Sequence, residues 1–384
     1  MQHVLYLDNA ATSFPKPPGV LKAMEECLAR HGGNPGRSGH RLSLEAGRIV
    51  FRAREKVAQL LGVSDSARVI FTSNATMAIN ITLFGFLREG DHVVTTSMEH
   101  NAVMRPLRHL EKIRHLKLTI VQCTPEGRLE ARHVKEALTG ETRLIVMTGA
   151  SNVTGTLFPV AEVAALKGKV PLLVDAAQTA GAVPLAPERD GIDMAAFSGH
   201  KSLMGPMGTG VLYMRQGMEL EPLFFGGTGS LSESEEMPEF LPDRFECGTL
   251  NVVGLAGLEA AAGHILEHGV EAVGAHERSL MAHLIEGLSS LGGVTIHGTA
   301  SPRESVAIVS LTMEGHDPAA LAHALDRQFS IMVRPGLHCA PLAHRTIGTF
   351  PAGTLRVSPG FSTSHEDIGA FLSALGAIKD SRHG

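Results

Sequence analysis

Cysteine is scarce in this chain, and its few copies indicate neither a disulfide framework nor a zinc ribbon. In 384 residues there are four cysteines, none of them in a CxxC pair, at Cys27, Cys123, Cys247 and Cys339. The twenty histidines are scattered, without an HExxH motif or a similar helical pair. The sequence therefore predicts no metal site.

Long apolar stretches are also missing. No run approaches the roughly 20 residues that a membrane-spanning helix needs, and the first residues, MQHVLYLDNAATS, lack the charged-then-apolar pattern of a signal peptide. The net charge of −5 argues against nucleic acid or an anionic membrane as the main partner. We therefore expect a cytoplasmic protein with no nucleic-acid or membrane partner, while local basic groups leave a small anionic ligand open.

Apolar runs typical of strands alternate with amphipathic helical patterns through the first two-thirds of the chain. The expected strands are Val69–Thr72, His92–Thr96, Leu118–Gln122, Leu144–Thr148 and Leu172–Asp175. Helical patterns accompany them, as in Ser43–Leu61 and Pro159–Leu166. This alternation predicts an α/β fold, with a mainly parallel sheet covered by helices. Ligands of such sheets gather at the carboxyl ends of the strands.

The pattern changes near residue 250. A long helical stretch is expected at Asn251–Leu291, followed by strands at Val294–His297, Val306–Thr312, Ser330–Val333 and Gly353–Ser358 and helices at Pro318–Phe329 and Ser364–Ile378. We expect a large domain over residues 16–255 and a smaller α+β domain over residues 256–384. Residues 1–15 are expected to pack near the active site and the small domain.

Lys201 follows an apolar strand, DMAAF, and enters a glycine-rich turn with the pattern SxHKxxxGPxGxG. A lysine at the mouth of a sheet can form a Schiff base when its surroundings lower its pKa. A lone Lys-Ser pair would more often be a surface lysine in a flexible loop. Here a hydroxyl, an imidazole and compact backbone stand beside the amine, which suits a phosphate held near a Schiff base.

Two further features lie at strand ends. Asp175 ends the apolar run LLVD, and a buried carboxylate is costly unless it meets a cation. The protonated ring nitrogen of pyridoxal phosphate is such a cation, although Asp175 alone would also be explained as a helix cap. In FTSNAT, residues 71–76, a strand passes into a helix whose free N–H groups and dipole form a ready phosphate site.

The order of the motifs resembles a known family. The chain reads YLDNAATS, FTSNAT, SMEHNA, SNVTGT, VDAAQ, SGHK, FECGT, RPGLHCA and LRVS, which is similar to class V aminotransferase-fold enzymes and most similar to the cysteine desulfurases. The resemblance spans nearly the whole chain. It implies the type I fold of transferases that depend on pyridoxal 5'-phosphate. It also implies conversion of L-cysteine to L-alanine, with the sulfur left as a persulfide on an enzyme cysteine.

The resemblance implies roles for individual residues. Lys201 matches the Schiff-base lysine, which also removes the α-proton, and Asp175 matches the partner of the pyridine nitrogen. His100 would stack over the ring, and Gln178 would hydrogen-bond the ring hydroxyl. The positions that match phosphate contacts are Ala75, Thr76, Ser198 and His200.

The remaining matched positions concern substrate and assembly. Arg356 matches the arginine that grips the substrate carboxylate by two-point pairing, which lysine reproduces poorly. Asn152 matches a residue near the ring and that carboxylate. Thr249 matches a phosphate contact donated by the other subunit, so a homodimer is expected. The expected sulfur acceptor is a carrier protein or a small thiol, as in iron–sulfur cluster assembly.

Cys339 lies in a compact loop, RPGLHCA, which resembles the cysteine loop of type II desulfurases. We expect Arg334 and His338 to favour its thiolate and the glycine turn to give it access. The alternative is a small buried thiol, the usual state of a cytosolic cysteine. That alternative is the better interpretation for the other three cysteines.

The chain departs from the family at several positions. Met77 stands where glutamate is frequent, Ala75 where a second hydroxyl often contacts phosphate, and Ser362-Thr363 where a Tyr-Asn pair is common. Residues 34–40 also differ near the active-site entrance. These departures leave open a selenocysteine lyase, or another aminotransferase, lyase or epimerase of this fold. A non-catalytic scaffold in sulfur or iron–sulfur assembly is disfavoured by the retained Lys201 and Arg356.

Overall fold

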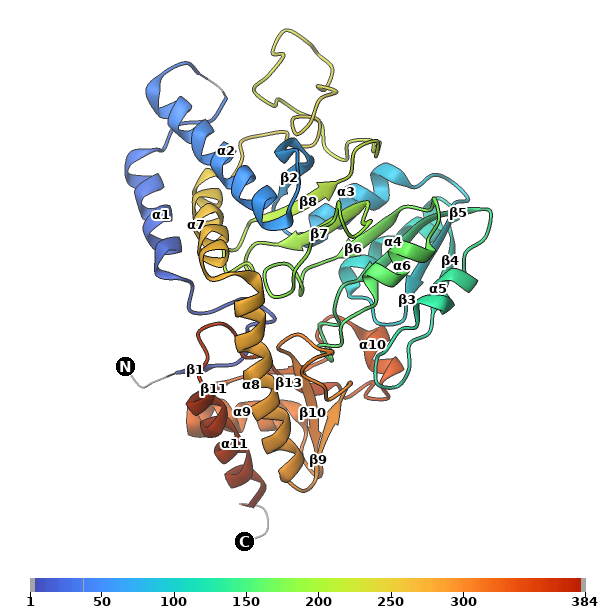
Figure 1. The fold of residues 1–384 in the computed structure, drawn as a ribbon, viewed down its shortest axis with the longest axis vertical. Helices are drawn as coiled ribbons and strands as arrows, with labels where there is room; N and C mark the ends of the chain where they lie inside the picture. Colours follow the sequence, from blue (N-terminus) through green and yellow to red (C-terminus); the bar gives the residue numbers. More distant parts are fainter. Residues whose placement is uncertain (1–3, 37, 381–384) are drawn as a thin grey trace.

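The computed structural model describes residues 4–36 and 38–380, and a seven-stranded sheet forms its centre (Figure 1). The strands lie in the order β2-β8-β7-β6-β5-β3-β4, with all neighbours parallel except those of β8. Their bounds are β2 Val69–Thr72, β3 His92–Thr96, β4 Lys117–Val121, β5 Thr142–Thr148, β6 Leu172–Asp175, β7 Met194–Ser198 and β8 Gly210–Met214. The expected parallel α/β sheet is confirmed.

Helices cover both faces of this sheet, which explains why its strands are apolar at consecutive positions. In β6, Leu172 and Val174 enter one hydrophobic cluster while Leu173 enters another on the opposite face. The covering helices are α1 Pro18–Arg30, α2 Arg41–Leu61, α3 Ala75–Phe86, α4 Asn101–Ile113, α5 Ala131–Glu136, α6 Val160–Leu166 and α7 Val252–His268. Among the described residues, no helix is both long and apolar enough to cross a bilayer.

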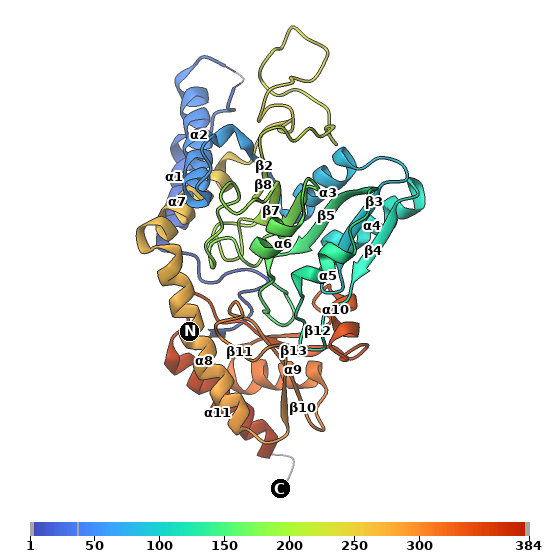
Figure 2. The same ribbon diagram turned by 45° about the vertical axis from the view of Figure 1, so that its right-hand side comes forward.

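A smaller, antiparallel sheet lies below the first in Figures 1 and 2, with its strands in the order β12-β13-β10-β9. Its strands are β9 Val294–His297, β10 Val309–Met313, β12 Arg334–Gly336 and β13 Thr354–Val357. The helices of this part are α8 Val270–Ser290, α9 Pro318–Phe329, α10 Pro341–Thr346 and α11 His365–Asp380. Leu280, Leu311 and Phe371 are among the residues of its fully buried core.

The expected continuous helical stretch at Asn251–Leu291 is wrong in one respect. Gly269, with φ 85° and ψ 133°, separates α7 from α8. This backbone conformation lies outside the helical region and is accessible to glycine without steric penalty. The break lets α7 pack on α1 and α2 while α8 packs on α11.

The amino-terminal segment joins the two sheets. Strand β1, Leu5–Tyr6, pairs in parallel with β11, Ile331–Met332. Asp8 then bridges to Ser358, just beyond β13. A few residues later, Ser13 N donates to the carbonyl of His200, beside Lys201. This segment therefore runs from the small sheet to the turn that holds the candidate cofactor lysine.

Candidate active site

A cavity of about 270 Å³ opens at the carboxyl ends of β5, β6 and β7. Most of the residues expected from the sequence to bind a cofactor line it: Ala75, Thr76, His100, Asn152, Asp175, Gln178, Ser198, His200 and Lys201. They come from strand ends, from helix starts and from the turns between them. The fold thus brings together residues that lie up to 126 positions apart, from Ala75 to Lys201.

Lys201, the candidate Schiff-base lysine, and Asp175, the expected partner of the ring nitrogen, both line the cavity. Asp175 ends β6 and is buried, and its Oδ1 accepts the N–H of Ala177 at 3.0 Å. That bond closes a turn and does not cap a helix, because no helix follows. Burial raises the pKa of Asp175, against the opposing effect of Lys201. Burial lowers the pKa of Lys201, helped by Arg356 and Arg334 and opposed by Asp175.

The start of helix α3 forms one end of the cavity. Ser198 Oγ accepts the N–H of Ala75 at 3.0 Å, and Asn74 Oδ1 accepts that of Met77 at 2.9 Å. Thr76 lies between them and lines the cavity. Asn74 had no role in the sequence interpretation, although asparagine before a helical run is a common N-cap. This arrangement holds a helix amino terminus toward the cavity, where an anion is favoured.

Gly210 permits this close packing. A Cβ at this position would lie 2.5 Å from the Asn74 Cα, so the first residue of β8 can only be glycine while the Asn74 backbone stays in place. The glycine-rich pattern after Lys201 therefore has a steric purpose at this end. It brings β8 directly under the start of α3.

Two histidines face the cavity in their neutral form. Burial, together with the neighbouring Lys201, lowers the pKa of His100 to about 4 and that of His200 to about 4. His100 caps α4, where its Nδ1 accepts the Ala102 N–H at 3.0 Å, so the neutral ring carries its proton on Nε2. His200 Nδ1 is buried and has no hydrogen-bond partner in the described part of the chain. It is a donor or acceptor that a ligand can satisfy.

Arg356 lies on β13 with only 1% of its surface exposed. Its Nη2 lies 2.8 Å from Asp8 Oδ1, and its Nη1 donates to the Asn152 carbonyl at 2.9 Å. Its Nε is buried without a partner among the described residues. Burial lowers the pKa of Arg356, and Asp8 opposes that effect. A second carboxylate could satisfy the remaining donors.

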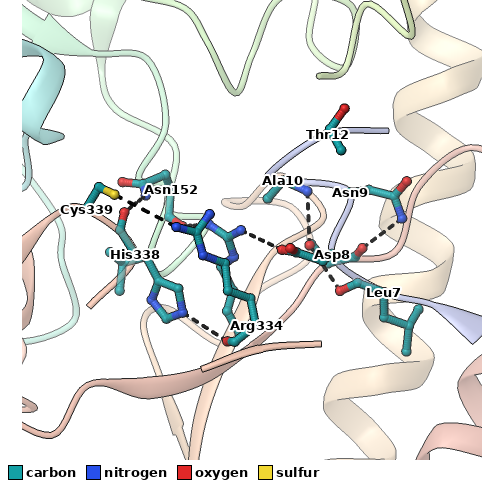
Figure 3. Close-up of polar contacts among 12 residues, drawn as sticks. Leu7, Asp8, Asn9, Ala10, Thr12, Asn152, Arg334, His338 and Cys339 are labelled. Carbon is teal, nitrogen blue, oxygen red and sulfur yellow. Dashed lines mark hydrogen bonds and ion pairs between the residues drawn. The ribbon is translucent and has the colours of Figure 1, made fainter. Parts of the chain in front are cut away.

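Asp8 is a site residue that sequence reasoning missed. It lies within the YLDNAATS motif, but nothing local to that motif indicates that an arginine 348 positions later is its partner. Gln178 is also tied to this segment, because its Nε2 donates to the Ala10 carbonyl at 3.1 Å. In Figure 3, Asp8 lies on one side of the site and Asn152 with Cys339 on the other.

Cys339 is exposed, whereas Cys27 is buried and Cys123 and Cys247 are intermediate, all four within the described residues. Arg334 Nη2 approaches the Cys339 Sγ at 3.9 Å. The Cys339 carbonyl accepts the N–H of Asn101, at the start of α4, at 2.8 Å. The thiol is therefore accessible, beside a guanidinium, and tied to the helix that begins at His100.

His338, which was expected to favour the thiolate together with Arg334, cannot do so as a cation. Its ring is buried, and burial lowers its pKa to about 3, with Arg356 adding to the effect. The ring is therefore neutral at physiological pH. Its Nε2 bonds to the Arg334 carbonyl at 3.0 Å, and its own carbonyl accepts from Asn152 Nδ2 at 2.8 Å. Through these two hydrogen bonds, His338 holds the loop of Cys339 in place.

Thr249 lies outside the cavity that contains Lys201. Its Oγ1 accepts from Asn34 Nδ2 at 3.2 Å, and it lines a separate cavity of about 490 Å³ with Met77 and Cys247. Asn34 belongs to the divergent segment 34–40, of which Arg37 lies outside the described residues. Within one chain, Thr249 is not a contact of the candidate cofactor site.

The comparisons with known proteins agree with one another. The family model for aminotransferase class-V matches residues 5–371. A protein of Methanothermobacter thermautotrophicus named "Probable cysteine desulfurase" is 35% identical over 95% of this chain and 92% of its own length. One of the same name from Aeropyrum pernix is 37% identical over 99% of this chain and 95% of its own length.

Solved structures give the same result. The apo structure of the cysteine desulfurase from Thermococcus onnurineus superposes with a TM-score of 0.92 at 31% identity, over 98% of this chain and 95% of that one. The Escherichia coli cysteine desulfurase CsdA, solved in its S-sulfonic acid form, superposes with a TM-score of 0.87 at 26% identity, over 98% and 95%.

Proposed function

The chain belongs to the class-V aminotransferase family, among its cysteine desulfurases, and we propose that it uses pyridoxal 5'-phosphate to move the sulfur of L-cysteine onto Cys339. One observation carries the proposal. Asn152 accepts from Arg356 and donates to the His338 carbonyl, so it links the carboxylate-binding arginine to the residue before Cys339. Asn152 also lines the Lys201 cavity. Asn152 therefore connects the Lys201 cavity with Arg356 and with the loop of Cys339, which supports the roles proposed for these three residues.

The residues of the cavity fit the cofactor. A buried Asp175, which has no ion pair among the described residues, suits a protonated ring nitrogen. The α3 amino terminus and the unpartnered His200 Nδ1 suit a phosphate. Lys201 would hold the cofactor covalently, and the neutral His100 would lie over its ring. When bound, pyridoxal phosphate supplies an electron sink that weakens bonds at the amino acid α-carbon.

The chain's own residues orient the substrate and move its protons. Arg356 binds the α-carboxylate through its guanidinium, with Asp8 and Asn152 fixing the plane of that group. With its amine free, Lys201 would take the α-proton on Nζ. Burial favours the neutral amine that this step needs, since it lowers the Lys201 pKa. Arg334 stabilises the Cys339 thiolate at 3.9 Å.

The proposed sulfur transfer needs no external oxidant. The Cys339 thiolate attacks the substrate sulfur, an S–S bond forms, and the Cβ–S bond breaks. The electron pair left on Cβ takes up a proton, so L-cysteine and the enzyme thiol give L-alanine and the enzyme persulfide. Two equivalents of a small thiol then release sulfide and form a disulfide, or a carrier protein takes the sulfur by exchange. The cytoplasm supplies such thiols, and we place the reaction there.

The enzyme is proposed to act as a homodimer in which Thr249 reaches the partner's phosphate site. Exposed large apolar side chains support an interface, and several of them lie on α1, on α2 and in the 224–240 loop. They include Leu21, Leu28, Phe51, Phe225 and Phe240. Thr249 lies next to that loop, in the cavity that Phe225 also lines.

Incubation of the cofactor-loaded protein with L-cysteine and dithiothreitol tests the proposed activity. Alanine and sulfide should appear together in equal amounts. L-Alanine should give no sulfide, and L-selenocysteine measured in parallel shows whether selenium is preferred. Pyruvate or a keto acid formed in place of alanine would contradict the proposal.

A further inference from the structure

The Cys339 loop has a backbone conformation that its residues rarely adopt. His338 has φ 49° and Cys339 has φ 57°, two consecutive non-glycine residues in the left-handed region. Such a conformation persists only where the surroundings enforce it. The main chain is tied at Asn101 and Asn152, and the His338 side chain provides a third anchor below the loop.

That third anchor is a chain of hydrogen bonds whose direction is fixed at one end. His338 Nε2 lies 3.0 Å from the Arg334 carbonyl, which can only accept, so His338 carries its proton on Nε2. In the neutral ring, His338 Nδ1 must then accept, and its neighbour at 3.3 Å is His344 Nε2, which must donate. His344 Nδ1 accepts in turn from Thr349 Oγ1 at 2.7 Å.

Both rings are held in the neutral form, which the bond from His344 to His338 Nδ1 requires of His338. His338 is 3% exposed and His344 is 0% exposed. Burial lowers the pKa of His338 to about 3, with Arg356, His344 and Arg334 adding to the effect. Burial also lowers the pKa of His344 to about 4, helped by His297. A second proton on His338 would sit on Nδ1, where it would face the Nε2–H of His344, so two donors would meet.

We propose that Thr349, His344 and His338 form a positioning relay that holds Cys339 and Arg334 in the geometry for sulfur transfer. The relay ends on the Arg334 carbonyl, so it fixes the backbone of the residue whose guanidinium approaches the thiol. The His338 N–H is already committed there, so the relay positions the sulfur acceptor and does not protonate it. The inference rests on the proposed function, because it assigns these residues to the sulfur-accepting loop.

Thr349→Val tests the relay, because it removes the hydroxyl donor while keeping the side-chain volume. Thr349 is only half-buried, so the variant should fold. We expect kcat for sulfide release to fall about 10-fold through misplacement of the thiol, with KM for cysteine unchanged. Thr349→Ser should restore kcat. Thr346→Val is the matched control and should retain activity, because it removes a hydroxyl at the end of α10 that bonds to the carbonyls of Ser97 and Leu342.

Two measurements test the relay without turnover. The pH dependence of Cys339 alkylation by iodoacetamide should shift in Thr349→Val. In Thr349→Ser it should return to that of the unaltered protein. In the unaltered protein, nitrogen-15 NMR of the imidazoles should show His338 and His344 as Nε2–H tautomers that stay neutral down to pH 5. If the unaltered protein makes no sulfide, the proposed function fails while these measurements still decide the relay. Either ring protonated on Nδ1, or a Thr349→Ser variant as impaired as Thr349→Val, would overturn it.

Discussion

The Arg356 guanidinium and the Asp8 carboxylate lie 2.8 Å apart, although 348 positions separate them in the chain. Asp8 belongs to the segment that continues to the His200 carbonyl, where Thr12, Ser13 and Lys16 all donate. The same segment therefore contacts the arginine proposed to bind the substrate carboxylate and the turn that holds Lys201. It keeps a buried guanidinium partly neutralised until the substrate carboxylate arrives.

Removing Arg356 should separate substrate binding from cofactor binding. In Arg356→Ala, KM for L-cysteine should rise roughly 10- to 100-fold, because a charge-assisted pairing is lost. The affinity for pyridoxal phosphate, measured by equilibrium dialysis, should stay close to that of the unaltered protein. Arg356→Lys should recover little, since an ammonium lacks the two-point geometry. An unchanged cysteine affinity in Arg356→Ala would rule out its role.

Lys201 should be the lysine that reduction with borohydride attaches to the cofactor. Lys16 is a demanding internal control, because its Nζ lies 3.0 Å from the His200 carbonyl and burial lowers its pKa to about 8. Lys201→Ala should lose the reducible linkage and at least about 10³-fold in turnover, while Lys16→Ala should keep the linkage. Peptide mapping that finds the cofactor on Lys16 would show that the assignment is mistaken.

Glu99 should make stability depend on pH. It is fully buried, and Thr96 Oγ1 and the Thr148 N–H bond to one oxygen while the other has no partner among the described residues. Burial raises its pKa to about 8, so the folded state binds the proton more tightly than the unfolded state. Its favourable contribution is complete below the unfolded pKa and is lost as pH rises toward 8.

Glu99→Gln removes this titration. The variant should gain stability over the unaltered protein as pH rises from 5 to 8, by an amount on the order of a few kcal/mol at the upper end. Denaturant titrations at several pH values measure the difference. Glu136→Gln, an exposed substitution on α5, should show none. A difference between Glu99→Gln and the unaltered protein that does not change with pH would contradict the prediction.

Thr249 and Lys201 should complement each other across a dimer. Homodimers of Thr249→Ala should bind the cofactor more weakly, and homodimers of Lys201→Ala should be inactive. A heterodimer of the two variants should contain one intact site, because Lys201 of one subunit would meet Thr249 of the other. Activity near half that of the unaltered dimer is expected. A heterodimer no more active than the Thr249→Ala homodimer would place Thr249 within its own subunit's site.

The sequence predicted those parts of the fold and the site that local patterns encode. Strands β2, β3, β6 and β9 begin and end at the expected residues, because each is a short apolar run bounded by turn residues. The strand end that presents Lys201 was predicted for the same reason. The break at Gly269 was missed, since a single glycine is often tolerated within a helical pattern.

The remaining features depend on contacts between distant segments. The pairing of Asp8 with Arg356 joins the two ends of the chain. The neutral state of His338 follows from burial, which the sequence RPGLHCA does not indicate. The sequence therefore predicted that His338 acts on the thiolate, whereas in the structure its ring bonds to the Arg334 carbonyl. Thr349 and His344 acquire a role only because α10 packs beneath the cysteine loop.

The most direct test of the account is the mass of the protein after a single turnover in Cys339→Ser and in the unaltered chain. With stoichiometric L-cysteine and no reductant, the unaltered protein should gain one sulfur atom, located on Cys339 by peptide mapping, and release one equivalent of alanine. Cys339→Ser should still bind cofactor and change its absorbance on adding cysteine. It should gain no sulfur and release almost no alanine, because a serine hydroxyl stays protonated at neutral pH. Normal alanine release by Cys339→Ser, or a persulfide on Cys123 or Cys247, would contradict the account.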